Sequence, residues 1–333
     1  MKVVVTGGTG FLGANLVRKL LVRGDEVHCI VRKPNICLQG LDVVIHQQPL
    51  GEDRASIERL ARIMDGAEIV YHLAGIFDPS PGGVDRMINL HVLATRGLLR
   101  ASEKAGVRRF LYCSSSITVG YGERDDLGNE DTYFNPAMAY GESGALIGYY
   151  RSKKQGEELV LGWRNIETVV VNPDYIIGPW DIKPTSGQLI VAMARGRLPL
   201  YPKGGKCFMT ASDCIDGHIA AALTGRAGER YLLGGENLSY SEFLGIVSKV
   251  VGKRPPRFAA PNIAFKMTGW LGEKLAKVDA HRFAGLDANV LRAMQENRFR
   301  SADKMRDELG IHPEPISNGV ERAFKWFVEH DYC

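Results

Sequence analysis

Tyrosine and lysine recur four residues apart in the segment Gly148–Glu157, GYYRSKKQGE. Two pairs fit this spacing, Tyr149 with Lys153 and Tyr150 with Lys154, and in a helix either pair would share one face. A free phenol has a pKa of about 10, so it is a poor acid or base at neutral pH. A neighbouring ammonium favours the phenolate and should bring the pKa of the tyrosine down. Such a pair can exchange a proton with a substrate oxygen while a nicotinamide exchanges a hydride.

A run of three serines, Ser114, Ser115 and Ser116, precedes this segment and directly follows the apolar stretch Arg109–Cys113. A serine hydroxyl that faces the tyrosine can hold the substrate oxygen by a hydrogen bond. The histidines form no H-x-x-x-H pair and the cysteines no C-x-x-C pair, so we expect no metal site.

The chain begins MKVVVTGGTGFLG, a pattern that predicts a strand, a turn and a helix. Lys2–Thr6 has the composition of a strand buried on both faces, and Ala14–Arg23 has apolar residues at helical spacing. Between them, Gly7 permits a tight turn, Gly10 lets backbone N–H groups approach a pyrophosphate, and Gly13 lets helix and strand pack closely. The positive end of the helix dipole would face the phosphates. We expect further cofactor contacts in this loop from Thr9, Phe11 and Leu12.

The second predicted strand, Glu26–Val31, ends in the cations Arg32 and Lys33. NAD-binding units of this kind place an acidic residue there, which bonds the ribose hydroxyls. Two cations can instead hold a 2′-phosphate, and arginine can do so through two parallel hydrogen bonds. We therefore expect NADP as the cofactor, with NAD as the alternative.

Strands and helices alternate through the first half of the chain. Further strands are predicted at Asp42–Ile45, Glu68–Leu73 and Arg109–Cys113, and helices at Ser56–Met64 and Leu90–Ala105. This alternation predicts an α/β fold with a doubly wound parallel sheet of the Rossmann type. Because ligands bind beyond the carboxyl ends of such strands, the glycine loop, Arg32, Ala74-Gly75 and the serine run should line one crevice.

The composition is that of a globular enzyme. The 333 residues are 45% hydrophobic and 24% charged, with a net charge of +4, which argues against disorder and against nucleic acid as the main partner. Met1 leads directly into the first strand, and we find no apolar run long enough to span a bilayer. Six scattered cysteines indicate reduced thiols, so we expect a cytoplasmic protein.

The segments TGGTGFLG, YHLAG, SSS, Y-x-x-S-K and NPDYIIGP, in this order, resemble the extended short-chain dehydrogenase/reductase superfamily over nearly the whole chain. The resemblance implies a catalytic Ser–Tyr–Lys set. The family has Ser just before the catalytic Lys and Glu four residues after it. Ser152 and Glu157 match these positions for Lys153, so the resemblance implies the pair Tyr149 and Lys153 rather than Tyr150 and Lys154. In the serine run, the resemblance implies Ser116 as the catalytic serine. The cofactor contacts that we expect beyond the glycine loop and Arg32-Lys33 are Leu73, Ala74, Gly75, Tyr149, Lys153, Pro173 and Ile176.

Some positions depart from the family pattern. Gln48-Pro49-Leu50 replaces Gly-Asp-Leu, whose Asp meets adenine, and His91 replaces the Asn four residues before Thr95. Ile117-Thr118 replaces the acidic pair of the nucleotide-sugar dehydratases, so we do not expect a 4,6-dehydratase. Lys206 stands where nucleotide-sugar epimerases use an Arg to hold the second phosphate.

The resemblance and the change in pattern after Gly178 divide the chain in two. We expect a dinucleotide-binding domain at 1–177 with about 208–236, and a smaller α/β substrate-binding lobe at 178–207 and 237–333. The amphipathic stretch 263–277 is interpreted as packing in that lobe rather than as a lipid-facing surface. The superfamily also implies a homodimer.

Within the superfamily, the motifs are most similar to the dihydroflavonol-4-reductase-like and hopanoid-associated sugar epimerase group. We therefore expect an NADP(H)-dependent carbonyl reductase or alcohol dehydrogenase that acts on a small, partly apolar molecule. The alternative is a sugar or nucleotide-sugar epimerase, which returns the hydride to the opposite face of a rotated keto intermediate. A non-catalytic NADP-sensing regulator is a third hypothesis, although relatives of that kind typically lack the Tyr–Lys pair.

Overall fold

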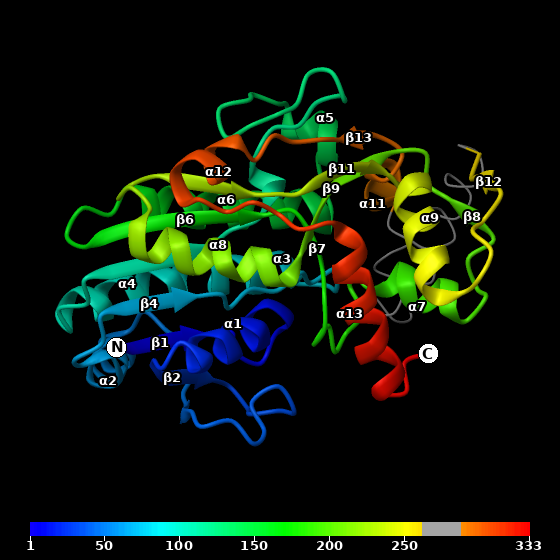
Figure 1. Ribbon diagram of the computed structural model, residues 1–333. Helices are drawn as coiled ribbons and strands as arrows, with labels where there is room; N and C mark the ends of the chain where they lie inside the picture. The colour runs from blue at the N-terminus through cyan, green and yellow to red at the C-terminus, as the bar shows by residue number, and fades with distance from the viewer. Residues whose placement is uncertain (262–287) are drawn as a thin grey trace.

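Seven strands form a parallel sheet in the order β10-β6-β5-β4-β1-β2-β3 (Figure 1). They are β1 (Lys2–Thr6), β2 (Glu26–Val31), β3 (Val44–Gln47), β4 (Ile69–His72), β5 (Arg109–Cys113), β6 (Glu167–Pro173) and β10 (Arg230–Leu233). The computed structural model describes residues 1–261 and 288–333, so the amphipathic stretch 263–277 lies outside the described residues. The predicted doubly wound α/β sheet of the Rossmann type is confirmed.

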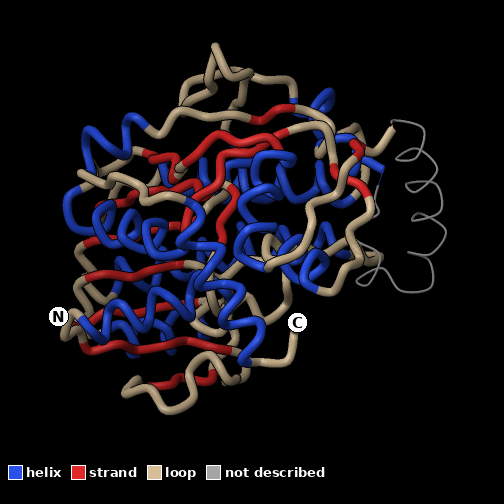
Figure 2. Tube along the Cα trace, turned by 45° about the vertical axis from the view of Figure 1, so that its right-hand side comes forward, coloured by secondary structure: helices blue, strands red, loops and turns tan. Residues whose placement is uncertain are grey.

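Helices cover both faces of this sheet (Figure 2). One face carries α1 (Phe11–Val22), α8 (Ala211–Thr224) and α12 (Asp303–Leu309), and the other carries α2 (Arg54–Met64), α4 (Thr95–Lys104) and α6 (Ala145–Leu161). The valines of β1 show why the strands are so apolar, since Val3, Val4 and Val5 are all completely buried. A sheet covered on both sides requires strands of this kind.

Several predicted elements have other bounds in the structure: α1 and α2 begin three and two residues earlier than predicted, and β4 is shorter by one residue at each end. The strand predicted at Asp42–Ile45 is β3, Val44–Gln47, because its pairing with β2 begins where Val44 lies opposite His28. The single helix predicted at Leu90–Ala105 is replaced by α3 (Gly83–Ile88), a π-helical turn η1 (Asn89–Ala94) and α4. Wider π turns inside helices are frequent at functional sites.

A second, smaller sheet is built around β9 (Gly205–Thr210), which pairs with β7 (Tyr175–Ile177), β11 (Glu236–Ser239) and β13 (Asn297–Arg298). The segment Leu198–Lys206, ahead of most of this sheet, contains β8 (Leu200–Tyr201) and the start of β9. Around this sheet pack α7 (Gln188–Ala194), α9 (Tyr240–Val251) and α13 (Ile316–Glu329). The remaining described elements are η2 (Ser116–Thr118), α5 (Pro136–Tyr140), β12 (Phe258–Ala259) and α11 (Ala288–Ala293).

Arg300, which follows β13, forms a buried ion pair with Asp174 at the end of β6 and also holds the loop that carries the serines. The Arg300 Nη1 atom lies 2.6 Å from the Asp174 carboxylate, and both side chains are buried. Arg300 also donates hydrogen bonds of 3.0 Å to the carbonyl oxygens of Gly120 and Ser116, and one of 3.1 Å to that of Val119. One guanidinium therefore fixes the path of the backbone beyond β5.

We expect Arg300→Met to lower the free energy of unfolding by about 3–5 kcal/mol, because it leaves the Asp174 carboxylate buried without its partner. Urea unfolding of the purified variant measures this loss. The double variant Arg300→Met with Asp174→Asn removes the stranded charge and should recover part of it. A single variant as stable as the wild type would show that the ion pair does not stabilise the fold.

Candidate functional site

The glycine loop between β1 and α1 has the close backbone contacts that its spacing predicts. Gly7 has a φ of +77°, which favours glycine, and its carbonyl oxygen accepts a 2.9 Å hydrogen bond from the N–H of Gly10. A Cβ atom on Gly13 would lie 2.1 Å from the oxygen of Gly7, and one on Gly7 would lie 2.6 Å from the backbone nitrogen of Ala74. Strand, loop and helix therefore fit together only without side chains at these positions.

The N-terminus of α1 is open to an anion. Its N-cap residue is Gly10, which has no side chain that could satisfy the first N–H groups of the helix. Of the neighbouring residues with expected contacts, Phe11 and Leu12 pack against the core, and Thr9 accepts a 3.0 Å hydrogen bond from Asn35 through its carbonyl oxygen. The groups left for a ligand are the backbone N–H groups, as pyrophosphate binding requires.

Arg32 and Lys33 are exposed directly after β2. The segment that follows them is held against the glycine loop at Cys37 and Leu38. Arg18 of α1 donates a 2.8 Å hydrogen bond to the carbonyl oxygen of Cys37, and the buried Leu38 side chain packs near Gly8. The two cations thus stand at the carboxyl edge of the sheet beside the loop, with no described ion pair that would occupy them.

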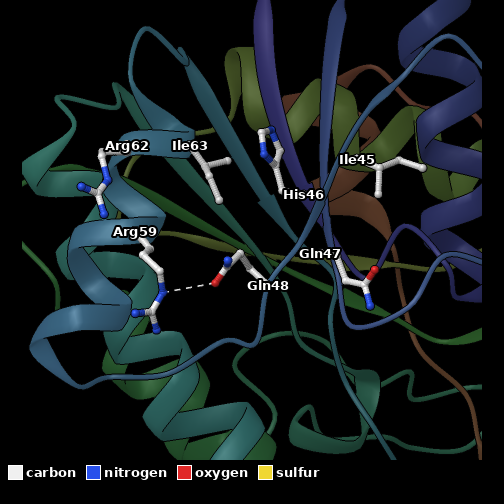
Figure 3. A pocket seen from close by; sticks show the side chains of 7 residues that line it. All are labelled: Ile45, His46, Gln47, Gln48, Arg59, Arg62 and Ile63. Atoms are coloured by element: carbon white, nitrogen blue, oxygen red, sulfur yellow. Dashed lines mark hydrogen bonds between the residues drawn. The ribbon is translucent and has the colours of Figure 1, made fainter.

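A pocket of about 460 Å³ lies at the open edge of the sheet, between β3 and α2 (Figure 3). Its lining residues are Ile45, His46, Gln47, Gln48, Arg59, Arg62 and Ile63. In it, Arg59 donates a 3.2 Å hydrogen bond to the side-chain oxygen of Gln48. Because neither Tyr149 nor Lys153 lines it, this pocket is not the place where a proton would be transferred.

Tyr149 and Lys153 both lie on α6 and face the end of β5. The Ser115 hydroxyl faces Tyr149 closely enough to act on the pKa of its phenol. The buried Lys153 ammonium donates a 2.9 Å hydrogen bond to the carbonyl oxygen of Cys113. The other tyrosine, Tyr150, instead contacts the rings of an aromatic cluster. The structure therefore brings Tyr149, Lys153 and the serine run together.

The three serines have different partners. Ser114 donates a 2.8 Å hydrogen bond to the buried carboxylate of Glu157. Ser115 accepts a hydrogen bond from the N–H of Ile117 and meets Tyr149. Ser116, the serine selected by the resemblance, begins η2 and accepts from Arg300 through its carbonyl oxygen. The hydroxyl that the structure pairs with the tyrosine is thus that of Ser115, which the sequence pattern did not select.

Burial dominates the protonation of the site. It raises the pKa of Tyr149 to about 12, and the Ser115 hydroxyl only partly opposes this rise. Burial also lowers the pKa of Lys153. The sequence predicted a lowered pKa for the tyrosine, and this prediction is wrong, since desolvation of the phenolate is the largest influence on that pKa. The phenol is therefore protonated at neutral pH and poised to donate.

Two buried histidines that the sequence pattern did not mark as site residues border Tyr149 and Lys153. His72, at the end of β4, is hydrogen-bonded to Thr6 at 2.6 Å and to Thr95 at 2.9 Å. His91, in η1, has its ring 5.7 Å from that of Tyr149. Burial, with the charge of Lys153, lowers the pKa of His72 to about 3 and that of His91 to about 2. Both imidazoles are neutral.

A cationic cluster lies on the side of the smaller sheet. Lys206 of β9 and Arg298 of β13 are register partners, and the Arg298 guanidinium lies 4.6 Å from the ring centre of Tyr121 and 4.8 Å from that of Tyr140. Burial and the neighbouring arginines lower the pKa of Lys206 to about 7. Tyr140 also contacts Tyr150, so the cluster adjoins the helix that carries Tyr149.

Residues 3–234 match the NAD dependent epimerase/dehydratase family. The chain belongs to this family. It is 31% identical to a Synechocystis sp. protein with the provisional name dihydroflavonol 4-reductase, covering 98% of this chain and 95% of that one. It is 30% identical to sterol demethylase protein B of Methylococcus capsulatus, with 99% of each chain covered. The crystal structure of gox2253 superposes with a TM-score of 0.82 at 30% identity, over 99% of this chain and 98% of that one.

Membership of the epimerase/dehydratase family makes this chain an NAD(P)-dependent oxidoreductase or epimerase. The residues present fit a nicotinamide dinucleotide, because the loop between β1 and α1 carries no side chain at Gly7, Gly10 and Gly13 and the N-terminus of α1 has no side-chain cap. Among the described residues, no group of three or more His, Cys, Asp or Glu side chains is arranged to hold a metal ion. No helix in the described ranges combines the length and the apolarity needed to cross a membrane.

We expect the stability of this family member to fall as the pH drops below about 6.5. His72, His91 and His218, whose pKa burial lowers to about 4, are neutral in the fold, whereas the unfolded chain takes up protons below about 6.5. Each contributes stability that is complete above that pH and is lost at about 1.4 kcal/mol per pH unit below it.

Urea unfolding at pH 7.5, 6.0 and 5.5 measures this dependence. His218→Asn, a change in α8 outside the site, should make the slope shallower by about 1.4 kcal/mol per pH unit. An unchanged free energy of unfolding between pH 7.5 and 5.5 would contradict the assignment of neutral, buried imidazoles.

Proposed function

We propose that the protein is an NADP(H)-dependent carbonyl reductase or alcohol dehydrogenase in which Tyr149 exchanges the proton. The observation that supports this most directly is the protonated Tyr149 phenol, which faces Ser115 on the helix that also carries the buried Lys153. The nicotinamide, when bound, supplies or accepts the hydride at the carbonyl carbon. In the reducing direction Tyr149 donates its proton to the carbonyl oxygen, and a serine hydroxyl holds that oxygen in place.

Lys153 has two tasks in this proposal. Its ammonium is held at the end of β5 by the Cys113 carbonyl oxygen, where it stabilises the Tyr149 phenolate that remains after proton donation. It also stands beside Gly75, since a Cβ on Gly75 would lie 3.1 Å from its Nζ atom. The backbone after β4 can therefore pass close to a cofactor that Lys153 reaches.

The proposed cofactor site combines the glycine loop with the ends of neighbouring strands. Its residues are Gly7, Thr9, Gly10, Phe11, Leu12, Gly13, Arg32, Lys33, Leu73, Ala74, Gly75, Tyr149, Lys153, Pro173 and Ile176. Exposed Arg32 and Lys33 support NADP, because they offer cations where NAD-binding units carry a carboxylate.

A partly apolar substrate is supported by the groups around Tyr149. Phe77 lies edge-on to the Tyr149 ring with 5.6 Å between ring centres, and 39% of its surface is exposed. The names of the two relatives, a dihydroflavonol 4-reductase and a sterol demethylase protein, both refer to polycyclic, largely apolar molecules.

A second candidate function is sugar or nucleotide-sugar epimerisation, and Lys206 and Arg298 support it. Two cations of the smaller sheet beside the aromatic Tyr121 and Tyr140 could bind an anionic part of a substrate. An epimerase needs a tightly held cofactor because it returns the hydride to the same molecule. Cofactor that stays bound through purification would thus favour the epimerase over the reductase.

We expect Tyr149→Phe to reduce kcat at least about 1,000-fold while the affinity for NADPH stays within about twofold, because only the transferable proton is removed. Steady-state reduction of a ketone panel and fluorescence titration of NADPH measure the two quantities. Tyr150→Phe is the matched control, since its ring packs in the aromatic cluster, and it should keep its turnover.

The serine pair is tested in the same assay. Ser115→Ala should reduce kcat more than Ser116→Ala if the hydroxyl seen against Tyr149 also holds the substrate. The reverse order would assign that role to Ser116, as the resemblance implies. Turnover that survives Tyr149→Phe would exclude Tyr149 as the acid, and a chain without turnover on any carbonyl or sugar substrate would favour the NADP-sensing regulator.

We expect NADPH to bind at least about tenfold more tightly than NADH, because Arg32 can bond the 2′-phosphate through two hydrogen bonds. Arg32→Ala should weaken NADPH binding by that factor and leave NADH binding within about twofold. Nicotinamide fluorescence titration of both proteins gives the four dissociation constants. Equal affinities in the wild type would remove the argument for NADP.

A further inference from the structure

The hydrogen bonds around His91 define which ring nitrogen carries the proton. The backbone N–H of Ile76 donates to Nε2 at 3.1 Å, so this nitrogen is an acceptor and has no proton. The proton of the neutral imidazole is therefore on Nδ1, which lies 2.9 Å from the Ser152 hydroxyl. The Ser152 hydroxyl in turn donates to the carbonyl oxygen of Tyr149 at 2.9 Å. Each polar atom in this series of hydrogen bonds, from Ile76 to the Tyr149 carbonyl oxygen, is thus assigned as a donor or as an acceptor.

The surroundings of His91 leave no room for a second charge. The side chain is completely buried, and a Cβ atom on Gly75 would lie 3.1 Å from the Lys153 ammonium and 3.4 Å from His91 Nε2. A protonated imidazole would lose the hydrogen bond from Ile76 and stand near a buried cation. Burial and the charge of Lys153 accordingly lower the pKa of His91 to about 2.

The backbone of His91 is fixed as firmly as its ring. Its carbonyl oxygen accepts a 2.8 Å hydrogen bond from the Thr95 hydroxyl, which lies 2.9 Å from Nε2 of His72. Since Thr95 donates to this carbonyl, it accepts from His72, whose other nitrogen lies 2.6 Å from the Thr6 hydroxyl of β1. The position of His91 is thus set by Thr6 of β1, His72 of β4 and Thr95 at the start of α4.

We propose that His91 is a positioning residue that sets the catalytic helix α6, and with it Tyr149 and Lys153, against the loop that follows β4. Its two nitrogens join that loop, at Ile76, to α6, at Ser152, and its ring packs edge-on to the Tyr149 ring at an angle of 72°. This inference rests on the proposed role of Tyr149 and adds a residue that touches neither substrate nor reacting atoms.

The first test compares three substitutions in steady-state kinetics. His91→Ala and His91→Phe cannot bridge Ile76 and Ser152, so kcat should fall about 10- to 100-fold, as small displacements of catalytic groups cause, while the affinity for NADPH stays within about twofold. In His91→Asn the amide can accept and donate in the same sense, so it should restore kcat to within about fivefold of the wild type. Wild-type kcat in His91→Ala, or no rescue by His91→Asn, overturns the proposal.

The second test needs no turnover and uses the wild-type protein. Long-range ¹H–¹⁵N correlation spectra of protein with ¹⁵N-labelled histidine report the tautomer of each ring, and His91→Asn identifies the His91 signals. We expect the neutral Nδ1–H tautomer at every pH from 5.5 to 8. A proton on Nε2, or titration in this range, overturns the proposal even where the substitutions fail to fold.

The two sets of variants separate this inference from the proposed function. Loss of turnover in Tyr149→Phe together with wild-type kcat in His91→Ala leaves the function standing and removes the role of His91. Turnover that survives Tyr149→Phe removes the proposed function, and the inference that rests on it, whatever the tautomer of His91 is.

Discussion

The site depends on how closely α6 lies against the sheet. A Cβ atom on Gly156 would lie 2.3 Å from the carbonyl oxygen of His91 and 2.6 Å from the hydroxyl of Tyr112, so only glycine permits this approach. The next residue, Glu157, is completely buried and accepts hydrogen bonds from Ser114, Thr118 and Asn172 and a charged one from Arg230. A buried carboxylate is tolerated because each of its partners donates to it. One and two turns earlier on the same helix, Lys153 and Tyr149 are therefore placed by steric fit and by charge.

The close packing of α6 against the sheet also explains why His72 and His91 are neutral, because it buries both of them near the Lys153 ammonium. Lys153 is a buried cation at the end of β5, and its ammonium is held by the dipole of the Cys113 carbonyl group, while no carboxylate among the described residues forms an ion pair with it. A site of this kind can hold one positive charge but not several. His72 and His91 are kept unprotonated, so each can act as donor at one nitrogen and acceptor at the other and can orient the backbone without adding charge.

The sequence predicted best the strands that are buried on both faces, because burial requires apolar side chains along their whole length. β1, β2 and β5 have their predicted bounds, since strands covered on both faces need continuous apolar runs, and the glycine spacing correctly predicted close packing of the helix at Gly13. The sheet around β9 was missed because Gly205 and Lys206 open the strand without such a run. Periodicity also cannot tell Ser115 from Ser116, because their side chains are set by the turn η2 after the strand. The direction of the Tyr149 pKa shift depends on its burial in three dimensions, which residue spacing does not contain.

The two candidate functions require different protonation states of Lys206. Burial beside Arg298 and Arg300 brings the pKa of this lysine to about 7, so at neutral pH it is only partly protonated. A phosphate or carboxylate placed beside it would favour the ammonium form, and binding would then take up a proton and gain a charged hydrogen bond. A neutral ketone gives the ammonium no such compensation for its desolvation, so the lysine would stay largely uncharged and its long apolar stem would contribute to the wall of the site. The same residue thus suits an anionic or an apolar substrate through its protonation state, and the chemistry at Tyr149 is common to both.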